Sequence, residues 1–151
     1  MIQRIQTVYL LLVAVLMGIT AISPLLLLNT SEGGLLDLCS CGIYNGKTLV
    51  KPIYGIVSMA GISVLLVFLN IFLFKKRKLQ TKVGHLTSLL IISFYITVAA
   101  YFSAFTSANG AAFSGIHYGI LLPVAALVLN VLAICKIKSD EKLVRSLDRI
   151  R

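Results

Sequence analysis

The chain has 151 residues, of which 58% are hydrophobic, and a formal net charge of +9 at pH 7. This length has room for one domain, but a water-soluble domain, with typically about 45–50% apolar residues, could not bury so much apolar surface. The basic residues border long apolar runs and form no basic face with interleaved aromatic residues, so anionic lipid head groups suit them better than nucleic acid. The composition therefore predicts an integral membrane protein with no nucleic-acid partner.

Four uncharged apolar stretches follow in chain order, at residues 8–28, 53–74, 86–106 and 116–135. Each has about twenty residues, the length that a helix needs to cross roughly 30 Å of hydrocarbon. In hydrocarbon every backbone amide needs an internal partner, so we expect helices despite the many β-branched residues. The first stretch exceeds the apolar core of a typical signal peptide and is expected to stay as a spanning helix. The pattern predicts an all-α fold, a membrane-embedded four-helix bundle formed by one domain over residues 1–151.

Basic residues are divided unequally between the segments outside these stretches. Only Lys47 and Lys51 lie in the second segment, and the other twelve of the fourteen lie before the first stretch, between the second and third, or after the fourth. Those twelve are Arg4, Lys75, Lys76, Arg77, Lys78, Lys82, Lys136, Lys138, Lys142, Arg145, Arg149 and Arg151. Because cytosolic segments are enriched in Lys and Arg, we expect both termini in the cytosol, next to anionic head groups.

The two external connections differ in size. Residues 29–51 form the larger one, in which Asn45-Gly46 separates residues 38–44 from 47–51. This is a strong β-hairpin signal, because both turn residues accept positive φ. A lone hairpin is marginal in water, so it would have to lie against the helix ends or a partner. Residues 107–115 carry no charge and are expected to form a tight turn.

The cytosolic tail, residues 136–151, has an amphipathic helical pattern in which Ser139 or Asp140 could cap a new helix. It is interpreted either as an extension of the fourth helix with a solvated face or as a helix that docks a partner or the membrane surface. The candidate docking residues are Leu143, Val144, Arg145, Leu147, Asp148, Arg149 and Ile150.

The four stretches contain no Asp, Glu, Lys or Arg, which argues against a proton-coupled transporter. Asn70 and Asn130 are expected either to hydrogen-bond across helices or to line a small-molecule path. His85 and His117 are separated by the bilayer and cannot share a site. Since no catalytic or phosphate-binding motif is present, we expect no enzyme activity, no catalytic residue, no cofactor and no metal.

Cys39 and Cys41 form a C-x-C on the external side. In an extended strand their Cα atoms would lie about 6.5–7 Å apart, near or beyond the limit for an unstrained disulfide. A bridge would therefore be strained and redox-labile, and the alternatives are two loop cysteines or two links to a partner. Cys135, at the cytosolic edge, suits packing between helices or acylation.

Small residues recur at four-residue steps and are candidates for close helix packing. They are Ala14 and Gly18 in the first stretch, Ala99 and Ser103 in the third, and Gly115 and Gly119 entering the fourth. They suit either packing within the bundle or contacts with a partner, and a homo-oligomer stays open.

The first ten residues, MIQRIQTVYL, and the last twelve, DEKLVRSLDRIR, resemble the two ends of a family of small Bacteroidota membrane proteins of unknown function. The resemblance implies a bacterial inner-membrane (cytoplasmic-membrane) protein with four spans, and it supplies no activity.

Three functional hypotheses follow. The first is a non-enzymatic accessory or scaffold subunit of a membrane complex, which docks a membrane or cytosolic protein through its tail. The second is a small transport or permeation component, which would need a polar lumen. The third is a periplasmic thiol redox role for Cys39 and Cys41.

Overall fold

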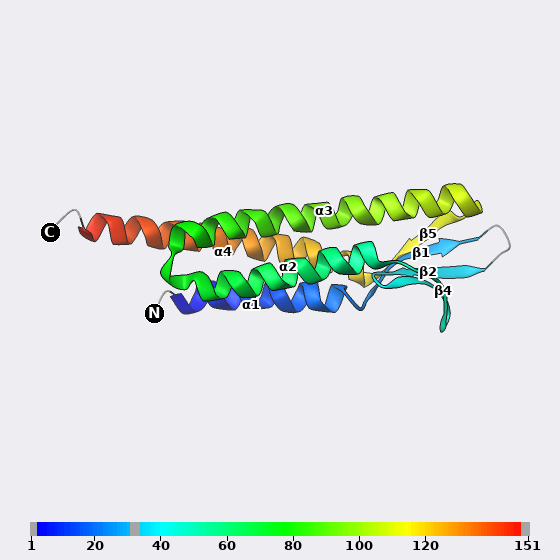
Figure 1. Ribbon diagram of the computed structural model, residues 1–151, viewed down its shortest axis with the longest axis horizontal. Coiled ribbons are helices and arrows are strands. Elements are labelled where there is room, and N and C mark those ends of the chain that lie inside the picture. The colour runs from blue at the N-terminus through cyan, green and yellow to red at the C-terminus, as the bar shows by residue number, and fades with distance from the viewer. Residues whose placement is uncertain (1–2, 31–33, 149–151) are drawn as a thin grey trace.

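The computed structural model describes residues 3–30 and 34–148. Within these ranges the chain forms an elongated molecule, in which long helices run side by side at one end and a β-sheet lies at the other (Figure 1). We call these the terminal end, where α1 begins and α4 ends, and the sheet end. The elements are α1 (Gln3–Thr20), β1 (Pro24–Asn29), β2 (Leu35–Cys39), β3 (Gly42–Asn45), β4 (Thr48–Pro52), α2 (Tyr54–Phe72), η1 (Leu73–Lys75), α3 (Arg77–Asn109), β5 (Ala112–Ile116), η2 (Tyr118–Ile120) and α4 (Leu122–Asp148).

The prediction of an all-α four-span bundle is wrong, because a five-stranded antiparallel sheet accompanies the helices. The strand order is β4-β3-β2-β1-β5. β1 comes from the end of the first apolar stretch, and β5 replaces the tight turn that we expected at residues 107–115. The fourth stretch likewise begins as strand and 3-10 helix, and α4 starts only at Leu122.

α1 ends at Thr20 rather than continuing to residue 28. Pro24 disfavours the helical conformation of the residue before it, and the Ser23 hydroxyl donates to the carbonyl of Ile19 at 2.7 Å. The next leucines form β1, which pairs with β2 on one side and β5 on the other. This pairing satisfies the backbone as a helix would, and it buries Leu25 and Leu28 completely.

Two tight hairpins complete the sheet. β2 and β3 are joined at Ser40 and Cys41, and β3 and β4 at Gly46 and Lys47, where Gly46 has a φ of 60°. The expected hairpin arm at residues 38–44 is therefore split between two strands. The Ser40 hydroxyl donates to the carbonyl of Thr20 at 2.7 Å, which ties the first hairpin to the end of α1.

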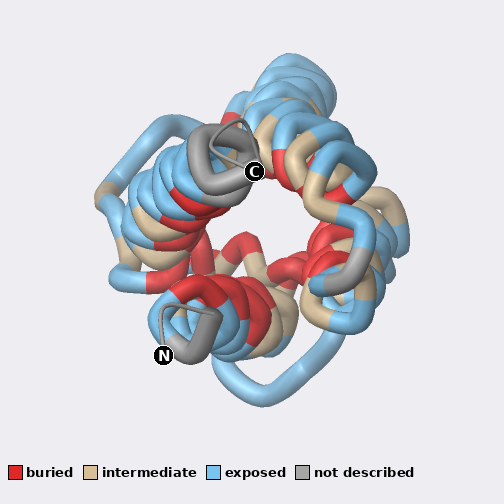
Figure 2. Tube along the Cα trace, turned by 90° about the vertical axis from the view of Figure 1, so that its left-hand side faces the viewer, coloured by how far each residue is buried: buried red, intermediate tan, exposed pale blue. Residues whose placement is uncertain are grey.

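The helices surround an apolar core to which each of them contributes (Figure 2). α1 contacts α2 and α4, and α3 contacts the same two helices. α3 has 33 residues, a length of about 50 Å, so it runs past the start of α2 and lies beside the sheet (Figure 1). There the rings of Phe102 and Phe113 pack edge to face with centroids 6.3 Å apart.

Apolar side chains also cover the outside of the bundle. Leu65 and Ile96 are 64% and 65% exposed, whereas Asn70 and Asn130 are fully buried. Three helices of the described chain are long and apolar enough to cross a membrane, namely Tyr54–Phe72, Arg77–Asn109 and Tyr118–Leu143, and the apolar part of α1, Ile5–Thr20, is shorter.

The tail is not a separate helix as far as it is described, because α4 continues without a break to Asp148. Asp140 lies inside this helix and is only 7% exposed, so it does not cap a new one. Leu143 is exposed. Of the other candidate docking residues, the backbone of Val144, Arg145, Leu147 and Asp148 is helical, and Arg149 and Ile150 lie outside the described residues.

Candidate functional site

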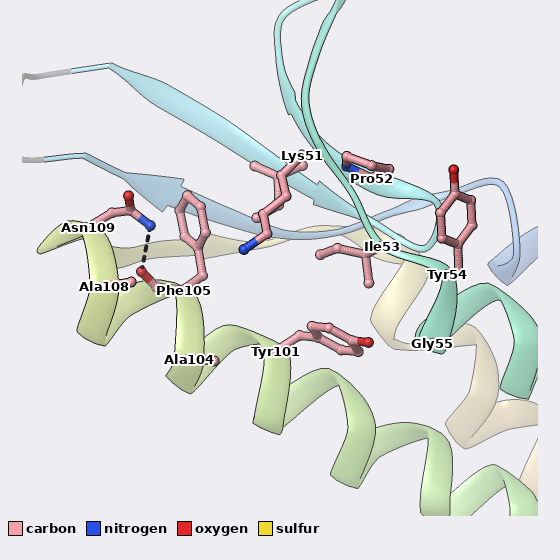
Figure 3. Close-up of a pocket in the computed structure, with 11 residues that line it drawn as sticks. Lys51, Pro52, Ile53, Tyr54, Gly55, Tyr101, Ala104, Phe105, Ala108 and Asn109 are labelled. Atoms are coloured by element: carbon pink, nitrogen blue, oxygen red, sulfur yellow. Dashed lines mark hydrogen bonds between the residues drawn. The ribbon is translucent and has the colours of Figure 1, made fainter.

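A cavity of about 330 Å³ lies where the sheet meets the helices (Figure 3). Its lining comes from β3 and β4, from the start of α2, and from the part of α3 that extends beside the sheet. The lining residues are Ile43, Lys51, Pro52, Ile53, Tyr54, Gly55, Tyr101, Ala104, Phe105, Ala108 and Asn109.

The connection from β4 to α2 shapes this cavity. The backbone N–H of Ile53 donates to the carbonyl of Cys41 at 3.0 Å, which fixes the start of α2 against the sheet. A Cβ atom on Gly55 would lie 2.6 Å from the Tyr101 hydroxyl oxygen. Glycine therefore gives the Tyr101 ring the space to lie against the first turn of α2.

The cavity is apolar with a few polar groups. Ile43, Ile53 and Phe105 give it aliphatic and aromatic surfaces, and none of its described lining residues is acidic. Figure 3 shows the Lys51 side chain reaching from β4 toward α3, with its ammonium group on the cavity side. The Tyr101 hydroxyl is a second donor. This combination suits an amphipathic ligand with a negative charge.

A second cavity, of about 320 Å³, contains the cysteine pair. Cys39 ends β2 and Cys41 lies in the following turn, so the two do not share one extended strand as we expected; both thiols are free. Burial raises the pKa of the Cys39 thiol, and the nearby Asp37 and Cys41 raise it further. A raised pKa lowers the thiolate population and so disfavours nucleophilic chemistry at Cys39.

His117 and Asp37 bridge β2 and the segment after β5. The His117 Nε2 and Asp37 Oδ1 atoms are 2.9 Å apart. Asp37 was missed as a site residue in the sequence, because a lone acidic residue in a predicted loop gives no signal of its partner. Throughout the described ranges, no cluster of three or more His, Cys, Asp or Glu residues could hold a metal ion. His85 is exposed on α3.

Polar side chains inside the bundle bond between helices. The Asn130 amide donates to the Gly84 carbonyl at 2.9 Å and to the Ser88 hydroxyl at 2.8 Å, which joins α4 to α3. The Gln80 amide donates to the backbone carbonyl of Asn70 at 3.3 Å, whereas the buried Asn70 side-chain amide has no hydrogen-bond partner among the described residues. Asn130 and Gln80 are therefore part of the helix packing, and, as far as the chain is described, the expected cross-helix bond of the Asn70 side chain is not formed.

A second polar group lies nearer the terminal end. Gln6 donates to the Asp140 carboxylate, and the Arg77 guanidinium donates to the Asp140 backbone carbonyl at 2.9 Å. Asp140 therefore connects α4 to both α1 and α3.

The candidate packing residues divide into three sets. Ala14 is buried in α1 and Gly18 is half-buried, whereas Ala99 and Ser103 are exposed on α3. Gly115 pairs with Leu27 in the sheet and Gly119 lies in η2, so the prediction that they begin the fourth helix is wrong. A Cβ atom on Gly119 would lie 2.3 Å from the Pro24 carbonyl oxygen, so this glycine permits close contact with β1.

The residues around the main cavity were not predicted as a site. The sequence indicates Lys51 only as a basic residue on the external side, and no motif in it points to Tyr54 or Tyr101. One signal was available, because tyrosines near the ends of apolar helices are typical of the membrane–water interface.

The fold defines a class of protein in which an apolar helical bundle, with helices able to cross a membrane, carries a small antiparallel sheet at one end. The chain belongs to the family described as "Domain of unknown function (DUF4293)", whose model matches residues 2–150. A comparison with curated proteins gives no match. Membership of a family of unknown function agrees with the resemblance at the two ends of the chain.

Proposed function

We propose that this protein is an integral membrane protein with its bundle in the bilayer and its sheet outside, and that it serves as a non-enzymatic accessory or scaffold subunit of a membrane complex. The observation that carries the proposal is the apolar outer surface of the bundle around buried polar residues. Such a surface is unfavourable in water and matches hydrocarbon.

The distribution of charge supports an orientation with both termini in the cytosol. The α2–α3 connection and the last turns of α4 lie at the terminal end (Figure 1). They carry Lys76, Arg77, Lys78 and Lys82, and Lys136, Lys138 and Lys142. Lys47 and Lys51 lie at the sheet end. By the positive-inside rule, the terminal end faces the cytosol, and in a bacterium the membrane would be the inner one.

The interior of the bundle supports a scaffold more than a transport component. Large apolar side chains such as Leu10, Met17 and Phe94 are fully buried there. The Asn130 side-chain amide donates both of its hydrogens to groups on α3, the Gly84 carbonyl and the Ser88 hydroxyl. A packed interior held by cross-helix bonds is typical of a structural bundle.

Orientation can be tested with a matched pair of cysteine variants in a background that lacks the native cysteines. Lys47→Cys lies in the β3–β4 turn and Lys78→Cys lies at the start of α3. A membrane-impermeant maleimide applied to spheroplasts is expected to label Lys47→Cys, and to label Lys78→Cys only after permeabilisation. The opposite pattern would invert the topology, and recovery of the protein in the soluble fraction would contradict membrane insertion.

Docking through the tail is tested by truncation. Because Asp140 is buried and bonded to α1 and α3, the cut belongs after Leu143 rather than before it. Deleting residues 144–151 is expected to leave the protein in the membrane and to remove a cross-linked partner from affinity purifications. Identical partners for the full-length and truncated proteins would sink the docking hypothesis.

A further inference from the structure

We propose that the cavity between β4, α2 and α3 binds the phosphate head group of an anionic phospholipid from the external leaflet. This inference rests on the proposed membrane placement. The phosphate diester of the lipid would be held by the Lys51 ammonium, with the Tyr101 ring as part of the cavity wall.

The depth of the cavity is the first argument. α2 has 19 residues, which gives a length of about 28 Å and matches one hydrocarbon layer. Its first residue, Tyr54, therefore lies at the membrane–water boundary, and the cavity lies at that level. Tyr54 is 75% exposed, as expected for a tyrosine among head groups.

The charge of the cavity is the second argument. Lys51 supplies a cation, and the described lining contains no carboxylate to neutralise it. The Tyr101 hydroxyl lies against Gly55 and points away from Lys51 (Figure 3), so Lys51 is the charged group that faces a ligand. A lysine ammonium group has three donors and suits phosphate oxygens.

The rest of the lining is the third argument. Ala104, Phe105 and Ala108 present an apolar side along α3, which suits the glycerol and upper acyl carbons of a lipid. A volume of about 330 Å³ is at the small end of ligand pockets, enough for a head group but not for whole acyl chains. Those chains would lie in the bilayer against the exposed apolar residues of α2 and α3.

The experiment uses the full-length protein reconstituted into vesicles of phosphatidylglycerol and phosphatidylcholine in equal amounts. Flotation first establishes insertion, and native mass spectrometry after detergent extraction then measures which lipid stays bound. Phosphatidylglycerol is expected to be retained in preference to phosphatidylcholine. Lys51→Gln should reduce this preference about fivefold, as expected for one basic residue at an anionic lipid surface. Tyr101→Phe should change it little, because the hydroxyl points away from Lys51.

Lys47→Gln is the matched control, since it removes the same charge from the same hairpin without lining the cavity. Circular dichroism checks that each variant is folded. Equal retention of the two lipids, or equal effects of Lys51→Gln and Lys47→Gln, would overturn the lipid site. Displacement of phosphatidylglycerol by millimolar inorganic phosphate would assign the cavity to a soluble phosphate compound instead. Failure of the wild type to float would overturn the membrane proposal itself.

Discussion

The helical bundle and the sheet differ in which side chains they expose. On the bundle, Leu65 and Ile96 face outward and Asn130 is fully buried, whereas in the sheet Leu28 and Leu38 are fully buried. The charged Asp37, Lys47 and Lys51 of the sheet region are exposed or half-buried. Large apolar side chains therefore lie on the outside of the bundle as well as in its core, whereas the inner strands β1 and β2 bury Leu28 and Leu38. Under the proposed membrane placement, this contrast corresponds to two solvents, lipid around the helices and water around the sheet.

The contrast is less complete at the edges of the sheet. Leu49 and Val50 on β4 and Phe113 on β5 are exposed, and both strands lie at the edges of the sheet order. The sheet is also tied to the bundle, since the Ser40 hydroxyl in the β2–β3 turn bonds to the carbonyl of Thr20 at the end of α1. The Tyr95 hydroxyl of α3 donates to the Ile120 carbonyl at 2.6 Å, which holds η2, the segment between β5 and α4, against α3. The sheet thus lies directly on the helix ends, which the proposed membrane placement puts at the boundary between water and lipid.

The largest expected effect comes from placing the same charge in the two regions. Leu65 lies near the middle of α2, and Leu49, on β4, is 51% exposed. Leu65→Lys should cost about 3 kcal/mol of insertion free energy, whereas Leu49→Lys should cost less than about 0.5 kcal/mol. The fraction of each variant that resists carbonate extraction from membranes measures the difference. Equal extraction of the two variants would contradict the proposal that lipid surrounds the bundle and water surrounds the sheet.

The sequence predicted the second and third helices well and the first and fourth poorly. Residues 53–74 correspond to α2 (Tyr54–Phe72), and residues 86–106 lie within α3 (Arg77–Asn109). The first stretch failed at Pro24–Asn29, because a short apolar run has no periodicity that distinguishes a helix from a buried strand. Residues 24–29 form a strand because they pair with β2 and β5. β5 is about ninety residues away along the chain, so a local sequence pattern cannot show this pairing.

The cavity at the sheet end was not predicted from the sequence, because its lining residues are also far apart along the chain. Lys51 and Tyr101 are fifty positions apart in the sequence and line the same cavity because α3 extends past α2 to the sheet. The length of α3 was underestimated, since its first turns are basic and its last turns consist of small and polar residues. A hydropathy pattern detects only the apolar part of a helix. It could not show that the polar ends of α3 are also helical, or that α3 reaches the sheet.

A smaller effect is expected from the polar interior of the bundle. Asn130→Ala removes two bonds from α4 to α3. Interhelical hydrogen bonds in membranes contribute about 0.6 kcal/mol on average and up to about 1.7 kcal/mol, so the loss should be about 1–2 kcal/mol. Reversible unfolding in dodecyl sulfate, followed by circular dichroism, measures it. Asn109→Ala is the control, because the Asn109 side-chain amide donates to the Phe105 carbonyl within α3 rather than to another helix. A stability equal to that of the control would mean that the buried amide does not hold the bundle together.

The smallest effect is a change in rate at Cys39, and it tests the water-facing half of the contrast. The negative charge of Asp37 helps to raise the pKa of this thiol, after burial as the main cause. Asp37→Asn should therefore lower the pKa, increase the thiolate fraction at pH 8 and speed alkylation by iodoacetamide, which mass spectrometry can follow at each cysteine separately. Cys135 on α4, far from Asp37, serves as the reference in the same sample. An unchanged or slower rate at Cys39 would mean that water screens the two groups from each other. In that case burial and Cys41 would account for the raised pKa, and the cavity around the cysteines would be wetter than its lining of Ile22 and Pro24 indicates.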